Sequence, residues 1–218
     1  VGQYTLHRAR KLAEQGGDVT LIGLGRETNE TVETVGKGTL RIVRLDAKRS
    51  AKDKFLKRLM WSLAINMRLM DSLSIALKRN RRANVMVTGS PPLLSYIVLM
   101  NNSLFWRTHV TYRITDFYPE VAFAAGKARW LAPVKPIFEG LRRAAGTIEV
   151  LGEDQKRRLH SGGIPASRIS LYRDDSPIKD WTTEIPIARP FSDEFRILLY
   201  SGNLGVALSM IAASKGYR

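Results

Sequence analysis

The chain has 218 residues, of which 44% are hydrophobic and 25% are charged, and its formal net charge is +15. These values are ordinary for a globular protein that can bury a sizeable core. Because the chain has no cysteine, disulfides, thiolate metal sites and cysteine nucleophiles are excluded. The longest apolar run, residues 93–100, is far shorter than the roughly 20 residues that a membrane-spanning helix requires.

The positive charge is concentrated in the first half of the chain. Residues 1–115 hold 20 Lys and Arg against 8 Asp and Glu, whereas residues 116–218 hold 15 against 12. The stretch from Lys48 to Arg82 alone carries 11 basic and 2 acidic residues. Such a local field attracts phospholipid, nucleic acid or a phosphate-bearing substrate, and composition alone does not distinguish these three partners.

Helix and strand patterns alternate along the chain. Spacing of apolar residues predicts helices at about residues 3–15, 51–80, 93–100, 136–145 and 153–161. Short apolar runs predict strands at 19–23, 40–45, 85–88, 109–114, 147–151 and 169–172. This alternation predicts an α/β protein with a doubly wound, mostly parallel, Rossmann-like sheet that binds its ligands at the carboxyl ends of the strands.

The apolar run 196–200 leads into Ser201-Gly-Asn-Leu-Gly205, the pattern of a buried strand that breaks into a glycine turn beside a phosphate or sugar. A complete nucleotide-binding unit needs a further strand and helix, for which the 13 residues after Gly205 are too few. We therefore expect residues 1–172 to form one domain, 173–195 a linker, and 196–218 the truncated start of a second domain. Because the chain enters a helix directly, we expect the first strand to precede Val1.

Residues 23–28 read Gly-x-Gly-x-x-Thr after a strand, which partly matches a dinucleotide-binding fingerprint. The third glycine is absent and the following residues lack a helical pattern, so we interpret the region as an ordinary loop. No Walker A, nucleophile-elbow or His-Glu-x-x-His sequence is present. The histidines at 7, 109 and 160 lack ligand spacing and there is no Asp-x-Asp pair, so the sequence predicts no metal and no bound cofactor.

The stretch Asp116-Phe-Tyr-Pro-Glu120 lies where a buried strand is expected to end. It places two carboxylates and two aromatic rings on a turn that Pro119 fixes. Carboxylates accept hydrogen bonds from sugar hydroxyls, and aromatic faces pack against the apolar faces of sugars. The same residues also fit a purely structural role, a strand end followed by a helix whose first turn places Glu120 favourably.

The order of motifs resembles the N-terminal half of the family-4 glycosyltransferases of the GT-B type, especially the branch that builds bacterial surface polysaccharides. The matching stretches are Val1–Thr5, Gln15–Thr20, Thr88–Pro92, Asp116–Glu120 with Gly126, Leu151–Glu153 with Gly162–Pro165, and Tyr200–Gly205. Gly17 and Thr115 stand where many relatives have a histidine, and residues 206–218 depart from the family pattern.

The resemblance implies a retaining, metal-independent transfer of a sugar from a nucleotide diphosphate sugar to a saccharide or polyprenyl-linked acceptor. It implies that Asp116 is catalytic. The substrate-binding residues that it implies are Gly2, Ser90 and Glu120 on this half, with Gly202, Asn203 and Gly205 near the donor diphosphate. Because the donor must be held between two domains, residues 1–218 alone are expected to show no turnover.

The resemblance also gives the basic stretch of the long helix a use. The family's acceptor is often lipid-linked at the cytoplasmic membrane face, which implies a cytoplasmic protein attached peripherally to the inner face of the plasma membrane. The residues expected to meet the anionic leaflet are Lys52, Lys54, Lys57 and Arg58. Alternatively, these basic residues simply form the solvent-exposed face of a helix whose other face packs on the core.

The alternative function is a non-catalytic basic α/β module that binds nucleic acid or another polyanion. The glycosyltransferase interpretation expects no nucleic-acid partner, so measuring whether the chain binds nucleic acid distinguishes the two hypotheses.

Overall fold

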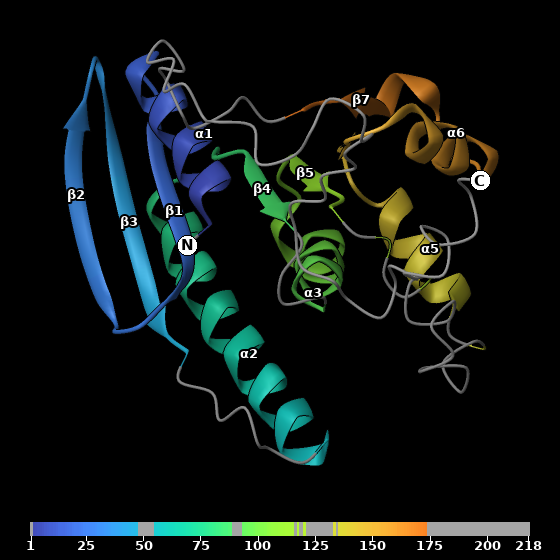
Figure 1. Cartoon of the computed structure of the whole chain (residues 1–218), viewed down its shortest axis with the longest axis horizontal. Coiled ribbons are helices and arrows are strands. Elements are labelled where there is room, and N and C mark those ends of the chain that lie inside the picture. Colours follow the sequence, from blue (N-terminus) through green and yellow to red (C-terminus); the bar gives the residue numbers. More distant parts are fainter. Residues whose placement is uncertain are drawn as a thin grey trace, which may run out of the picture.

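The structure, a computed structural model (Figure 1), describes residues 2–47, 55–88, 93–115, 117, 120, 133 and 135–173. This part of the chain forms an α/β protein with five α-helices and seven strands. In chain order the elements are α1 (Gln3–Glu14), β1 (Asp18–Gly25), β2 (Asn29–Val35), β3 (Gly38–Asp46), α2 (Phe55–Arg79), β4 (Val85–Thr88), α3 (Leu94–Asn101), the π-helical turn η1 (Asn102–Trp106), β5 (Val110–Arg113), α5 (Lys135–Arg143), β6 (Thr147–Val150), α6 (Glu153–Ser161), the 3₁₀ turn η3 (Ala166–Arg168) and β7 (Ile169–Leu171).

The helices lie where the spacing of apolar residues predicts them. The two glycines after α1 end that helix, since Gly16 has a φ of 97° and its N–H donates to the carbonyl of Ala13 at 2.8 Å. In α2 the buried residues Ile65, Leu69 and Leu77 recur at helical spacing and turn one face of the helix toward the core.

The seven strands are divided between two sheets. β1, β3 and β2 form a mixed sheet in that order, and β4, β5, β6 and β7 form a sheet that is entirely parallel. The predicted alternation of helices and strands is confirmed for the described residues, and all pairs of described strands except β2 with β3 are parallel. The prediction of one continuous sheet is not met in the described strands, since no hydrogen-bonded ladder joins β1 to β4.

The loop predicted after the first strand is wrong for residues 29–35. They form β2, which pairs antiparallel with β3 along its whole length. Gly23 and Gly25 lie inside β1, where they pair with β3, so the partial fingerprint is strand and not a turn around a phosphate. β2 is a polar edge strand with mostly exposed residues, and it therefore lacks the buried alternation by which strands are predicted.

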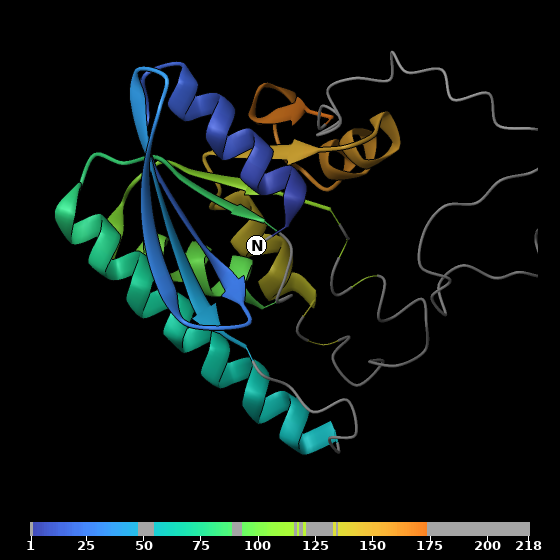
Figure 2. The ribbon, with the colours of Figure 1, turned by 60° about the vertical axis from the view of Figure 1, so that its left-hand side comes forward.

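Helices cover both faces of the three-stranded sheet (Figure 2). Ala9 and Ala13 of α1 pack against one face, and Leu45 of β3 packs against α2 on the other. α2 also contacts the four-stranded sheet, because Met70 and Leu77 belong to the apolar cluster formed around β4 to β7. This one helix therefore packs against both sheets and connects their cores.

The first residue of β3, Gly38, packs closely against the end of α1. A Cβ atom at Gly38 would overlap the carbonyl oxygen of Gly17 and lie 2.5 Å from that of Ala13. We expect Gly38→Ala to lower the free energy of unfolding, measured in urea, by about 3 kcal/mol, because two backbone segments must move apart.

Gly140 in α5 provides the matched control for this substitution. Among the described residues, no atom outside the backbone of α5 itself lies within 4 Å of a Cβ atom there, so Gly140→Ala is expected to raise the free energy of unfolding by about 0.5–1 kcal/mol through its helix propensity. Equal effects of the two glycine substitutions would contradict the close approach at Gly38.

Candidate functional site

The parallel sheet brings the carboxyl ends of β4, β5, β6 and β7 to one edge. This is the edge at which α/β proteins bind their ligands. β5 leads directly into the block predicted as a site, of which Phe117 and Glu120 are described and Asp116 lies outside the described residues. At the end of the next strand, α6 begins with Glu153 and Asp154 in its first turn.

Most of the predicted site residues are not among those that the structure describes. Outside the described residues lie Lys52, Lys54, Ser90, Asp116, Gly202, Asn203 and Gly205. Lys57 and Arg58 belong to the first turns of α2, and their side chains are likewise outside the description. The roles given to all of these residues stay predictions.

Gly2 caps the start of α1 in an extended conformation, with φ −69° and ψ 143°. Its carbonyl accepts the first helical hydrogen bond, from the N–H of Leu6 at 3.0 Å, and no side chain caps the helix. A Cβ atom at Gly2 would meet only the hydroxyl of Thr5, at 3.8 Å. The fold therefore does not require glycine here, and the predicted contact with substrate stays a prediction.

Glu120 is held by a buried arginine. Arg142 donates to Oε1 of Glu120 at 2.6 Å and to Oε2 at 2.7 Å, so both carboxylate oxygens are engaged. The same guanidinium donates to the hydroxyl of Tyr96 at 2.9 Å and is only 4% exposed. This bidentate pair ties Glu120 to α5, a structural role different from the helix-terminus position considered for Glu120 from the sequence.

The environment changes the protonation of this group. Burial alone would raise the pKa of the Glu120 carboxyl, but the hydrogen bonds and charge of Arg142 outweigh burial and hold that pKa below its ordinary value. Burial, followed by the neighbouring Tyr112, raises the pKa of Tyr96 far above its ordinary value. Burial likewise raises the pKa of Tyr112. At neutral pH the cluster therefore consists of one ion pair and two neutral phenols.

A cavity of about 250 Å³ lies beside this cluster, between α5, α6 and the segment after β5. Its charged lining residues are Lys135, Arg142 and Arg158 with Glu120 and Glu139. Each carboxylate forms an ion pair within the cavity, since Lys135 lies 3.5 Å from Glu139 and Arg142 binds Glu120, whose pKa the charge of Arg158 also helps to lower.

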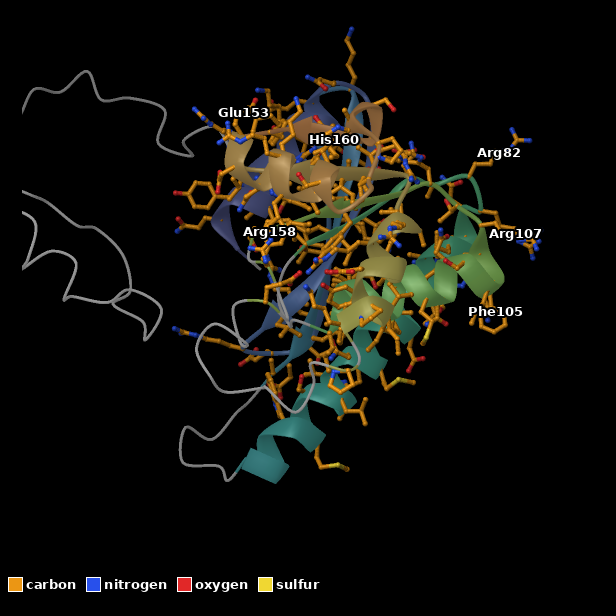
Figure 3. All side chains as sticks on the ribbon, turned by 90° about the vertical axis from the view of Figure 1, so that its right-hand side faces the viewer. Arg82, Phe105, Arg107, Glu153, Arg158 and His160 are labelled. Carbon is orange, nitrogen blue, oxygen red and sulfur yellow. The ribbon has the colours of Figure 1, made fainter. Side chains whose placement is uncertain are left out.

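The remaining cation, Arg158, packs over the ring of Phe117 at 5.1 Å and forms no ion pair with a described residue. Figure 3 shows it projecting from α6. A cavity with one surplus guanidinium over an aromatic ring is suited to a carboxylate or phosphate group on a ligand.

A second charged cluster lies between α1 and the middle of the four-stranded sheet. Arg8 donates to both carboxylate oxygens of Glu149 on β6, at 2.6 and 2.8 Å, and Arg113 of β5 donates at 3.3 Å. The guanidinium groups of Arg8 and Arg113 lie 4.0 and 5.1 Å from the centre of the Tyr172 ring. The pairing links α1 to the four-stranded sheet.

Sequence reasoning missed both of these arginine clusters. A carboxylate within the apolar run of β6 was a usable signal for Glu149, because a charge in a buried strand requires a partner. Nothing in the local sequence distinguishes Arg142 from the arginine that follows it, yet Arg142 is buried and Arg143 is exposed.

Comparisons with known proteins add no functional assignment: no protein-family model and no curated protein matches the chain. Within the described residues, no three histidine or carboxylate side chains gather closely enough to hold a metal ion. No helix of this part of the chain combines the length and the apolar character needed to cross a membrane.

Proposed function

We propose that this chain is the acceptor-side half of a retaining glycosyltransferase of the GT-B type that takes a nucleotide diphosphate sugar as donor. The observation that carries the proposal is the order of the family-like motifs along an α/β chain with a parallel sheet. The block from Asp116 to Glu120 follows the carboxyl end of β5, the edge where such sheets bind ligands.

In this proposal Asp116 is the catalytic carboxylate and orients a hydroxyl of the sugar through a hydrogen bond. Ser90 and the N–H groups that follow Gly2 contact substrate oxygens, and Glu120 contributes through the turn that Arg142 holds. Gly202, Asn203 and Gly205 approach the donor diphosphate in the complete enzyme.

The cavity beside Glu120 supports an acceptor that carries an anionic group. Its surplus cation, Arg158, matches the phosphate of a polyprenyl-linked saccharide better than it matches a neutral sugar. The acceptor is therefore proposed to be a phosphate-bearing saccharide.

The proposal is tested first on the sequence encoded beyond Arg218. A second α/β domain with paired glutamates would support it, and any other continuation would contradict it. With that domain present, the protein is assayed for transfer of labelled sugar from nucleotide diphosphate sugars to lipid-linked acceptors.

Asp116→Asn in the two-domain protein is expected to lower kcat about 10²–10³-fold, because it removes the charge of the proposed catalytic carboxylate. Asp71→Asn, on the exposed face of α2, is the matched control and should leave kcat unchanged. Residues 1–218 alone should show no transfer. Robust transfer by this fragment would contradict the two-domain assignment.

The net charge of +15 favours one competing function, a basic module that binds nucleic acid. Salt-sensitive binding of single-stranded or duplex nucleic acid, with no uptake of labelled sugar by the two-domain protein, would establish that alternative.

A further inference from the structure

Two large apolar side chains are exposed at the connection between α3 and β5. Phe105 is 72% exposed and Leu104 is 62% exposed, more than any other large apolar residue in the described part of the chain. Figure 3 shows Phe105 projecting from the same side of the molecule as Arg82 and Arg107. We call Leu104, Phe105, Arg107, Arg81 and Arg82 the Phe105 edge.

The connection that carries these side chains is held rigidly. The buried side chain of Asn102 donates to the carbonyl of Thr108 at 2.9 Å and accepts from its N–H at 2.9 Å. Arg107 adopts the left-handed conformation, with φ 51°, and its N–H donates to the carbonyl of Asn102 at 3.0 Å. A non-glycine residue in that conformation is costly and persists only where its surroundings fix it. Trp106 packs against the core, so the exposed position of Phe105 is built into the fold.

The neighbouring connection, between α2 and β4, supplies the charge. The hydroxyl of Thr108 donates to the carbonyl of Ala83 at 2.6 Å, which places the two connections side by side. The exposed cations on them and on the last turn of α2 are Lys78, Arg79, Arg81, Arg82 and Arg107. The sequence has no acidic residue between Asp71 and Asp116, and none of these cations forms an ion pair with a described residue.

We propose that the Phe105 edge binds an anionic phospholipid surface, with Leu104 and Phe105 inserted among the headgroups and the arginines on the phosphates. Cations alone would suit nucleic acid, and an apolar pair alone would suit a protein groove. Apolar side chains at the tip of a rigid turn, surrounded by cations, are the combination that suits the boundary between headgroups and acyl chains.

This surface is separate from the predicted substrate site and from the basic stretch at residues 52–58. It lies at the amino ends of β4 and β5, whereas the proposed site follows the carboxyl end of β5. Lys57 and Arg58 lie in the first turn of α2, at the other end of a helix whose 25 residues extend about 37 Å. The inference does not depend on glycosyl transfer, and the experiment can distinguish the two ends of the helix.

The experiment is cosedimentation of the chain with vesicles of phosphatidylcholine, with and without phosphatidylglycerol. The unmodified chain should bind only the anionic vesicles, and high salt should weaken binding. Leu104→Ser with Phe105→Ser should weaken binding more than about tenfold, because apolar insertion is lost. Arg81→Glu with Arg82→Glu should also weaken it more than about tenfold, since each cation near an anionic leaflet contributes about fivefold.

Two controls distinguish binding through the Phe105 edge from non-specific electrostatic or hydrophobic binding to vesicles. Arg26→Glu with Lys37→Glu reverses two exposed cations elsewhere and gives the same net charge as the arginine variant. Ile137→Ser removes a 60% exposed apolar residue from α5. Both controls should bind as the unmodified chain does, and circular dichroism should show all variants folded, since every substituted residue is exposed.

Three results would overturn the proposal. The first is that the unmodified chain does not bind anionic vesicles, and the second is that the Leu104 and Phe105 variant binds them unchanged. The third is that vesicle binding is lost when the charges of Lys52, Lys54, Lys57 and Arg58 are reversed but not when those of Arg81 and Arg82 are. Preferential binding of nucleic acid in competition with the vesicles would assign the edge to that partner instead.

Discussion

Glu149→Ala is expected to lower the free energy of unfolding by about 3–5 kcal/mol. Glu149 lies in the middle of β6 and is 8% exposed. Its carboxylate forms ion pairs with both Arg8 and Arg113. Alanine would remove this carboxylate from two largely buried guanidinium groups, and with it a charge that offsets the cost of their desolvation.

Urea denaturation at neutral pH measures this effect. Glu33→Ala is the matched control, because the carboxylate of Glu33 meets Arg10 at 3.4 Å with both side chains more than one-third exposed. That substitution should cost less than about 1 kcal/mol, since water screens and replaces an exposed pair. Similar losses for the two variants would mean that the Glu149 cluster does not fix α1 to the sheet.

The elements that the sequence predicts well are those with a buried face. α6 begins and ends where its pattern predicts, and β4 is a short apolar run that was also placed correctly. β2 was missed because an edge strand pairs through its backbone and buries little, so its side chains carry no periodic signal. Strand patterns also do not specify which edges pair, and the division into two sheets could not be predicted from them.

The candidate site was predictable only in part, for a similar reason. The Asp116 to Glu120 block is visible in sequence because carboxylates, aromatics and a proline follow a strand. The partner of Glu120 is not visible, because adjacent Arg142 and Arg143 differ only in the direction that each points from α5. That direction depends on how the helix is rotated against α3, and this is set by packing of residues distant in sequence.

Arg142→Met is expected to lower the free energy of unfolding by about 3–5 kcal/mol at neutral pH, because the carboxylate of Glu120 would lose its buried partner. Combining it with Glu120→Leu should cost less than Arg142→Met alone, since the second change removes the unpaired charge. A double variant as unstable as the single one would show that packing of the arginine, and not its charge, stabilises this site.

The pH dependence of stability gives a sharper test of the same pair. In the unmodified chain the pKa of Glu120 is lowered on folding, so Glu120 stabilises the fold above its ordinary pKa of 4.5, and this contribution is lost as the pH falls. In Arg142→Met, burial is the largest of the remaining causes and acts to raise the pKa of Glu120, so we expect that pKa to lie above its ordinary value. Its contribution should then change sign, so that lowering the pH from 7 toward 4.5 makes this variant more stable relative to Arg142→Met with Glu120→Gln. Urea unfolding of the two variants at several pH values measures the difference. An unchanged sign would mean that the backbone hydrogen bond and Arg158 suffice to hold the pKa of this carboxylate down without Arg142.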